Sequence, residues 1–139
     1  MAKAEGKSFD FLDHTHIDTK ALEVFAFEFY DQEILTVTKE FSAVCPFSGL
    51  PDIATVRIRY YPTDHKCIEL KSLKYYLTSF RNVGIYQEAV TARISNDLGT
   101  VLGTKVEVVT IYNTRGGFDT VCIQNKLHNY APAAKPELL

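Results

Sequence analysis

The spacing of hydrophobic residues changes twice along the chain, and this change is the strongest limit on the folds that the chain can adopt. Four segments alternate between apolar and polar residues in the manner of strands: 34–41, 53–61, 105–112 and 118–127. Between residues 70 and 102 the apolar residues instead recur every three or four positions, as on one side of a helix. The predicted order is strand, strand, helix, helix, strand, strand, with a further short strand around 24–30.

Two amphipathic helices are expected in the middle segment. The first starts at residue 70, and its buried side is predicted to consist of Leu70, Leu73, Leu77 and Phe80. Gly84 supplies a stop signal after it. The second is expected from about Tyr86 to Leu102, and its buried side is predicted to consist of Val90, Ile94, Leu98 and Leu102. The stretch NTRGG between the last two strands is typical of a hairpin connection.

Two strand pairs on either side of a helix pair predict an α+β domain, in which an antiparallel sheet carries both helices on one face. The other face would be uncovered, and because it bears aliphatic and aromatic side chains as well as polar ones, oligomerisation is the expected way to cover it and the sheet edges. Both ends of the chain lack sustained periodicity. We therefore expect a loosely ordered N-terminal arm over 1–22, one domain over 23–127 and a C-terminal tail over 128–139.

The composition narrows the classes of function. A chain of 139 residues that is 46% hydrophobic fits one compact domain. Its net charge of −2 gives no basic excess for a nucleic-acid backbone, so a small-molecule substrate is expected and a nucleic-acid partner is not. No stretch resembles a signal peptide or a membrane span, which predicts a cytoplasmic protein without a membrane partner. Cys45, Cys67 and Cys122 lack the spacing of a disulfide framework or a zinc knuckle, so we expect reduced thiols.

The loop between the first two predicted strands holds the strongest candidates for chemistry. Within FSAVCPFSGLPD, residues 41–52, Cys45 opens the loop and Asp52 closes it at the start of the next strand. A thiolate is the strongest nucleophile among the common side chains, and a cysteine in such a turn can reach a substrate. The alternative is that Cys45 is a small buried hydrophobic residue, which is what we expect of Cys67 and Cys122.

Metal sites and a protease-like pair have less support. The residues Asp13, His14, His16 and Asp18 could hold a metal, but a polar, mobile tail explains them better. Cys45, His65 and Cys67 could bind zinc, but they lack the characteristic ligand spacing. No histidine lies near Cys45 in the sequence, so a Cys–His pair is not indicated either. We expect no metal.

A basic stripe follows the first predicted helix. Lys71, Lys74, Thr78 and Arg81 recur at helical spacing beside the apolar stripe, without an interleaved acid. Such a stripe is usually solvated surface, but its cations could also hold phosphate groups. Arg115 in the hairpin could add a further cation, although an arginine in a turn more often has no such function.

Glu88 lies in the first turn of the second predicted helix. A carboxylate at that position is favoured by the helix dipole and needs no further explanation. It could alternatively accept two N–H groups at once from the edge of a purine-like base.

Together these stretches resemble the NADPH-dependent 7-cyano-7-deazaguanine reductases, the nitrile reductases of queuosine biosynthesis, in their short single-domain form. The matching pieces are CPFSGLPD (45–52), ELKSLKYYLTSFRN (69–82), Glu88 in YQE, and RGG (115–117). They come in the family's order and span most of residues 40–125. ELKSLKYY fits the family signature E-(S/L)-K-(S/A)-hydrophobic-K-(L/Y)-aromatic, which is associated with NADPH binding. One departure is Gln87, where many members have histidine.

The resemblance implies a fold, an assembly and a set of site residues. The fold would be the tunnelling fold, whose β-β-α-α-β-β subunits form rings with active sites at their interfaces, typically as a decamer of two stacked pentamers. The substrate would be contacted by Glu69, Ser72, Tyr86 and Glu88. The NADPH cofactor would be contacted by Lys71, Lys74, Arg115 and Gly116.

The resemblance also implies a mechanism. The thiolate of Cys45 would add to the electrophilic nitrile carbon and form a covalent thioimide, while Asp52 protonates the nitrogen. Asp52 would have to stay protonated near neutral pH, which burial in a closed site could favour. Reduction of a nitrile to an amine takes four electrons, so two NADPH would bind in succession.

Three other functions are compatible with part of the same sequence pattern. A related enzyme could form the thioimide but deliver ammonia to a base already in transfer RNA; such an enzyme would favour a basic surface and would not need ELKSLKYY. A purine-binding or ring-forming protein without catalysis would leave Cys45 and Asp52 as a coincidence. A zinc-dependent cyclohydrolase of the same fold would need a Cys/His ligand set that the chain lacks.

Overall fold

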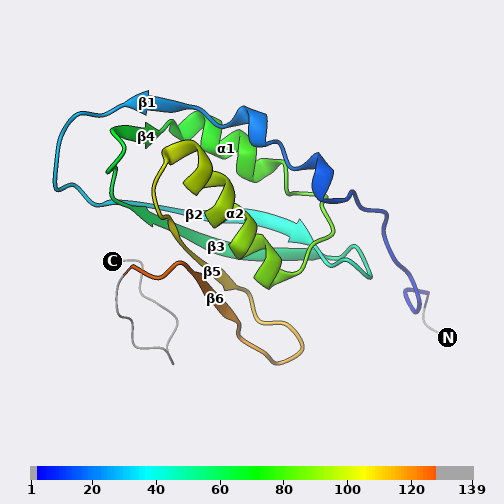
Figure 1. Ribbon diagram of the computed structural model, residues 1–139. Coiled ribbons are helices and arrows are strands. Elements are labelled where there is room, and N and C mark those ends of the chain that lie inside the picture. The colour runs from blue at the N-terminus through cyan, green and yellow to red at the C-terminus, as the bar shows by residue number, and fades with distance from the viewer. Residues whose placement is uncertain (1–2, 128–139) are drawn as a thin grey trace.

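The computed structural model describes residues 3–127, which form two antiparallel sheets and two α-helices (Figure 1). The strands are β1 (Val24–Ala26), β2 (Ile34–Val44), β3 (Pro51–Tyr60), β4 (Lys66–Ile68), β5 (Glu107–Tyr112) and β6 (Val121–Gln124). The helices are α1 (Leu70–Thr78) and α2 (Gln87–Leu102), preceded by two short 3₁₀ helices at His14–His16 and Thr19–Ala21. The predicted α+β class is confirmed.

The main sheet has the strand order β2-β3-β5-β6, and each pair of neighbours is antiparallel. It thus joins the two predicted strand pairs, with α1 and α2 between them in sequence and on one face of the sheet in space (Figure 1). The short strand expected around residues 24–30 is β1. It pairs with β4, which the predicted element order did not include, and Phe25 lies opposite Cys67 in this second sheet.

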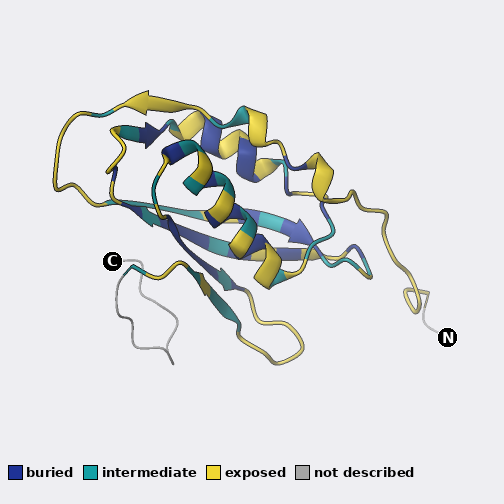
Figure 2. Ribbon diagram, viewed as in Figure 1, coloured by how far each residue is buried: buried dark blue, intermediate teal, exposed yellow. Residues whose placement is uncertain are grey.

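The core lies between the main sheet and the helices, as Figure 2 shows by the dark blue positions that face each other. Alternate residues of β3 supply one side of it: Ala54, Val56, Ile58 and Tyr60. The predicted stripe of α2 supplies the other side: Val90, Ile94, Leu98 and Leu102. α2 ends where Gly103 adopts a left-handed conformation (φ 66°), in which a residue without a side chain costs least.

The first helix differs from its prediction in two ways. It ends at Thr78 instead of continuing toward Gly84, and Leu70 is 59% exposed although it was predicted to be buried. Tyr76 is fully buried and Ser72 nearly so, which shifts the centre of the buried side away from Leu70. Leu70 therefore lies at the margin of that side, in the first turn, and lines a groove between α1 and β2.

The opposite face of the sheet is less open to solvent than its residue pattern predicted. Arg57 is 4% exposed there, and Glu107 is 1% exposed. Arg59 pairs with Glu107 at 3.4 Å and also with Glu33. Long paired side chains lie across the strands and cover their neighbours with their apolar stems.

The described part of the predicted arm contacts the domain. Ile17 is 5% exposed and belongs to the core, and Leu12 forms a parallel bridge with Val83. Phe9 donates its backbone N–H to the carbonyl of Ser48 at 2.7 Å. The boundary placed after residue 22 stays a prediction, and the tail predicted over 128–139 lies outside the described residues. Over residues 3–127 no helix is both long and apolar enough to cross a membrane.

Candidate active site

Three connections meet at one end of the main sheet. The loop from β2 to β3 holds Cys45, the start of α2 holds Glu88, and the β5–β6 hairpin holds Arg115. Figure 1 shows the three at the same end of the molecule, opposite the β1–β4 sheet. Antiparallel pairing brings the three segments together, because β2 ends, β3 begins and β5 ends at the same end of the sheet.

The Cys45 loop is a compact turn. The N–H of Cys45 donates to the carbonyl of Leu50 at 2.9 Å, and the N–H of Gly49 donates to the carbonyl of Cys45 at 2.9 Å. Gly49 has φ 71°, and a Cβ at this position would overlap the carbonyl of Phe9. Only glycine fits both conditions. The turn therefore leaves the Cys45 side chain half-buried at the sheet end instead of in the core.

The Cys45 thiol is surrounded by hydrogen-bond donors that favour its ionised form. The backbone N–H of Ser48 has the largest effect, and the N–H of Phe47, the hydroxyl of Ser48 and the guanidinium of Arg115 add to it. Burial acts in the opposite direction, but the donors outweigh it and lower the pKa of Cys45 to about 7. Cys45 therefore ionises more readily than an ordinary cysteine.

Asp52 is buried and paired with Arg115. It follows the alternation of β3, so its side chain faces the helices, and only 5% of that side chain is exposed. Arg115 donates from Nη1 to Oδ1 of Asp52. The pairing joins residues 63 positions apart in the chain.

A two-residue turn presents Arg115 to Asp52. Arg115 and Phe118 exchange backbone hydrogen bonds at 2.9 and 2.8 Å around Gly116 and Gly117. Both glycines have positive φ, 56° and 84°, which is the conformation that a tight hairpin turn requires. The predicted hairpin is thus present.

Two pockets adjoin at this end of the sheet. The first, called the cysteine pocket here, has a volume of about 180 Å³ and is lined by Cys45, Pro46, Asp52, Tyr86, Gln87, Glu88 and Arg115. The second, called the hairpin pocket, has a volume of about 410 Å³ and is lined by Gln87, Asn113, Arg115, Gly116, Phe118 and Thr120. Gln87 and Arg115 line both pockets, so these two side chains form the wall between them.

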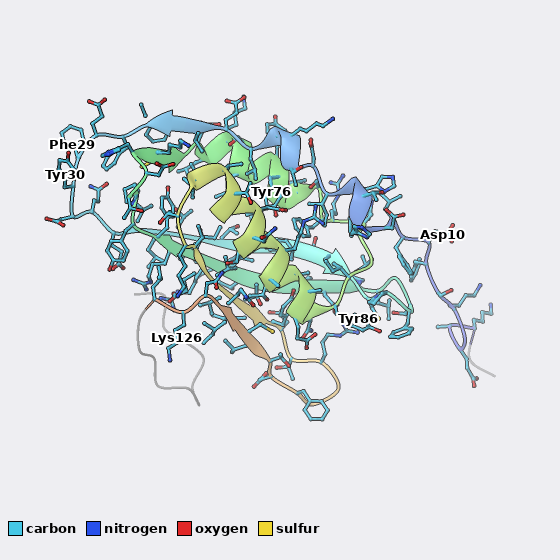
Figure 3. All side chains as sticks on the ribbon, viewed as in Figure 1. Asp10, Phe29, Tyr30, Tyr76, Tyr86 and Lys126 are labelled. Carbon is cyan, nitrogen blue, oxygen red and sulfur yellow. The ribbon has the colours of Figure 1, made fainter. Side chains whose placement is uncertain are left out.

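The backbone before α2 is fixed next to the Cys45 loop. Val44 accepts the N–H of Ile85 at 3.1 Å and donates to Val83 at 3.0 Å. Tyr86 then packs edge-on against Phe47, with ring centroids 5.9 Å apart. Figure 3 shows Tyr86 at the end of α2 that faces this loop, and Phe29 and Tyr30 at the other end of the molecule. The first turn of α2 therefore faces Cys45.

Three of the four residues of the predicted basic stripe line a different groove. A groove of about 410 Å³ runs between α1 and β2, and its lining includes Lys74, Thr78 and Arg81. The residues that line this groove do not include any residue of the cysteine or hairpin pocket. Lys71 is exposed on the same helix, and Lys74 lies 3.8 Å from Glu40. One chain therefore does not bring these lysines to Cys45.

Glu69 and Ser72 have structural contacts in this chain. The carboxylate of Glu69 accepts the backbone N–H groups of Lys71 and Ser72, each at 2.8 Å, and so caps α1. The hydroxyl of Ser72 accepts the N–H of Glu23 at 3.0 Å, just before β1. A contact of either side chain with substrate stays a prediction.

Residues 3–127 contain no group of three or more His, Cys, Asp and Glu side chains placed to hold a metal ion. His16 lies 3.5 Å from Asp13 on an exposed 3₁₀ turn, and Cys67 is buried opposite Phe25 in the small sheet.

Sequence reasoning missed two features of the site. One is the Asp52–Arg115 ion pair, for which no local signal exists because the partners lie on different connections. The other is Phe47, whose ring packs against Tyr86 of the cysteine pocket; an exposed aromatic residue next to a candidate nucleophile was a signal for it.

The fold and the site together define a class of protein. It is an α+β domain in which a readily ionised cysteine and a buried carboxylate lie at one end of an antiparallel sheet. A family model described as QueF-like protein matches residues 51–131, more than half of the chain. The chain belongs to this QueF-like family.

Named relatives support the assignment. Proteins named NADPH-dependent 7-cyano-7-deazaguanine reductase from Thermotoga petrophila and Thermotoga maritima are each 58% identical over 121 residues, covering 86% of this chain and 88% of the relative. A protein of that name from Caldicellulosiruptor bescii is 46% identical over 121 residues, with 85% and 92% covered. The crystal structure of the archaeosine synthase QueF-Like in the apo form has a TM-score of 0.56 and 19% identity, over 68% of this chain and 92% of that chain. The structural likeness supports the predicted tunnelling fold.

Proposed function

We propose that this protein reduces the nitrile of 7-cyano-7-deazaguanine to the aminomethyl group, with NADPH as reductant, as a step of queuosine biosynthesis. The relatives' names supply the reaction. The observation that supports this reaction for this chain is the cysteine pocket, in which a thiol with a pKa of about 7 lies beside a buried carboxylate.

The first step is addition of Cys45 to the nitrile. The sulfur forms a bond to the nitrile carbon, one π bond of the C≡N group breaks, and the nitrogen takes a proton, which gives a thioimide without any change in oxidation level. The proton balance needs only the thiol's own proton. In our proposal Asp52, which is paired with Arg115, accepts that proton and delivers it to the nitrogen. The Cys45–Asp52 pair must therefore carry one proton when the substrate binds.

The start of α2 supports recognition of the base. Glu88 lines the cysteine pocket, and its carboxylate can accept two N–H groups from the edge of the deazaguanine. Tyr86 lines the pocket and packs against Phe47, and a planar base can pack against the Tyr86 ring. We also propose contacts of the base with Glu69 and Ser72, and these rest on the family resemblance alone.

The residues assigned to the cofactor fit an anionic ligand. Lys71 and Lys74 are exposed ammonium groups, and Arg115 and Gly116 line the hairpin pocket. When bound, NADPH supplies two electrons at a time, so two molecules must act in succession. Cys45 suits the step that follows addition as well, since a thiol of low pKa is a good leaving group.

The separation of the α1 lysines from Cys45 within one chain supports sites shared between subunits. We therefore infer rings of subunits, in the form of a decamer of two pentamers that the family resemblance implies, with α1 of one copy completing the site of the next. Such a closed site would keep the imine-level intermediate from water. Cytoplasmic location belongs to the same proposal, because queuosine is a modification of transfer RNA.

One assay tests the function. We expect NADPH absorbance to fall only when 7-cyano-7-deazaguanine is present, with two NADPH consumed for each aminomethyl product. An ammonia-dependent change in transfer RNA would instead indicate the amidine-forming enzyme. Binding of the base without NADPH consumption would indicate a non-catalytic protein, and bound zinc would indicate a cyclohydrolase. Any of these three results would overturn the proposal.

A further inference from the structure

The side of α2 that faces the sheet carries a row of polar residues. Glu88, Thr91 and Ser95 recur three and four positions apart, so they lie on one side of the helix. The hydroxyl of Thr91 shares a hydrogen bond of 2.6 Å with the hydroxyl of Thr110 on β5. One turn further along the helix, Ser95 donates to the carbonyl of Val106 at 2.6 Å. These two contacts fix how α2 lies along β5 and show that the two elements run in opposite directions.

Tyr112 lies on the same face of β5 as Thr110, because the two residues are two positions apart on one strand. It is about 7 Å further along the strand than Thr110. Glu88 comes three residues before Thr91, which is about 4.5 Å along the helix. Both steps lead to the end of the sheet where α2 begins and β5 ends (Figure 1). Tyr112 therefore lies beneath the first turn of α2, from which Glu88 lines the cysteine pocket.

The hydroxyl of Tyr112 is a buried donor. The residue is 1% exposed, and its hydroxyl oxygen has no hydrogen-bond partner among residues 3–127. Burial raises the pKa of Tyr112 above its usual value, and the neighbouring Cys122 and Glu88 raise it further, so the hydroxyl keeps its proton. A buried hydroxyl without a hydrogen bond costs free energy, and a phenylalanine at this position would avoid that cost. Packing alone therefore does not explain why the residue is a tyrosine.

Glu88 offers a matching acceptor. Its side chain is exposed at the cysteine pocket, and over the described range no hydrogen bond or ion pair engages its carboxylate. An ionised carboxylate has about four lone-pair sites on its two oxygens. Two N–H groups of a purine-like edge would use one site on each oxygen, so a further donor can bind the same carboxylate from the side of the sheet.

We propose that Tyr112 is a positioning residue for recognition of the base: when the deazaguanine binds and orders the Glu88 side chain, the Tyr112 hydroxyl donates a hydrogen bond to the Glu88 carboxylate and holds it in the orientation that accepts both N–H groups. The inference rests on the proposed reductase function, because that function supplies the base. The hydroxyl lowers stability in the free protein and contributes affinity in the complex, as residues that serve a binding site often do.

The test is the affinity for 7-cyano-7-deazaguanine, measured by calorimetry in the Cys45→Ala protein, in which no covalent adduct can form. Tyr112→Phe should raise the Kd about ten-fold, the usual loss for a hydrogen bond to a charged group. The same change in a protein that also carries Glu88→Ala should leave the Kd unchanged, because Tyr112 acts through that carboxylate. An equal rise in both backgrounds would mean that Tyr112→Phe disturbs the pocket as a whole, and it would overturn the proposal.

Urea unfolding separates this role from a structural one. Tyr112→Phe should leave the unfolding midpoint unchanged or raise it, because the hydroxyl has no partner to lose within residues 3–127. Tyr60→Phe is the matched control, because Tyr60 is also 1% exposed but accepts the N–H of Ile68 at 3.0 Å and does not line the cysteine pocket. It should lower the midpoint and leave the Kd for the base unchanged.

Two results would overturn the role of Tyr112 and leave the reductase function intact: an unchanged Kd in Tyr112→Phe, or a lower unfolding midpoint in that variant. Absence of base binding to the protein in which Glu88 and Tyr112 are both intact would overturn the inference and the proposed function together.

Discussion

The cysteine pocket and the basic side of α1 are built differently, although both were singled out in the sequence. The cysteine pocket collects residues from three connections within one chain, and its acid is nearly fully buried. The lysines of α1 lie on an exposed helix surface beside a separate groove. Within one chain, the cysteine pocket already brings a thiol and a buried carboxylate together. An exposed basic surface such as that of Lys71 and Lys74 needs a ligand or a second copy to give it a function. Variants of the two regions should therefore fail in different steps.

The largest effect is expected for Cys45→Ala. Without the thiol, no thioimide can form, so the covalent adduct seen by intact-protein mass spectrometry without NADPH should disappear completely. Cys122→Ala is the control, because Cys122 lies in β6 and lines neither pocket. An undiminished adduct in Cys45→Ala would place the nucleophile at another cysteine.

The second largest effect is expected for Asp52→Asn. The amide has nearly the same shape but cannot relay a proton, so adduct formation should slow by ~10²-fold or more in a protein that remains folded and still binds the base. Stopped-flow measurement of the adduct rate in both proteins decides this. An unchanged rate would leave Asp52 as a residue that only holds Arg115 in place.

The pH dependence of the wild type tests the shared proton. Below its pKa of about 7 Cys45 keeps the proton that the nitrogen needs, and above it the Cys45–Asp52 pair has lost that proton. The adduct rate should therefore fall by up to about ten-fold per pH unit as the pH rises above 7. Alkylation by iodoacetamide needs only the thiolate, so its rate should rise through pH 7 and then level off. If both rates rose together, the relay through Asp52 would be excluded.

Removal of a lysine charge should have a smaller effect on a different step. Lys71→Met and Lys74→Met should each raise the KM for NADPH about ten-fold, the usual loss for a charge-assisted hydrogen bond. The rate of adduct formation should stay unchanged, because neither lysine lines the cysteine pocket. Lys105→Met, an exposed change before β5, is the control. Equal losses in both steps would mean that the α1 lysines act through folding or through substrate binding.

The smallest effect is expected for Glu69→Ala. Two backbone N–H groups at the start of α1 would lose their acceptor, which should lower the free energy of unfolding by about 1 kcal/mol. Urea unfolding measures it. Glu69→Gln retains an acceptor oxygen and should lose less. A variant of unchanged stability that no longer binds the base would assign Glu69 to the substrate alone.

Sequence patterns were sufficient where a local rule decides the outcome. The alternation of Ala54 to Tyr60 and the helical repeat of Val90 to Leu102 determine which face is buried, because burial follows the period of the backbone. The loop around Cys45 and the glycine pair after Arg115 likewise identify tight turns, since only those residue types tolerate the conformation. The same rules misplaced Leu70, because its burial depends on how closely α1 approaches β2, and Leu70 lines the groove between them.

The tertiary structure alone decided which distant residues meet. Nothing near Asp52 in the sequence points to Arg115, and the ion pair exists because antiparallel pairing brings the β2–β3 loop and the β5–β6 hairpin to the same end of the sheet. The low pKa of Cys45 arises in the same way, from N–H groups that a folded turn directs at one sulfur and from a guanidinium supplied by another connection. The sequence determined which reactive groups the protein has. The fold determined which groups lie next to Cys45 and Asp52, and these neighbours favour their charged or neutral forms.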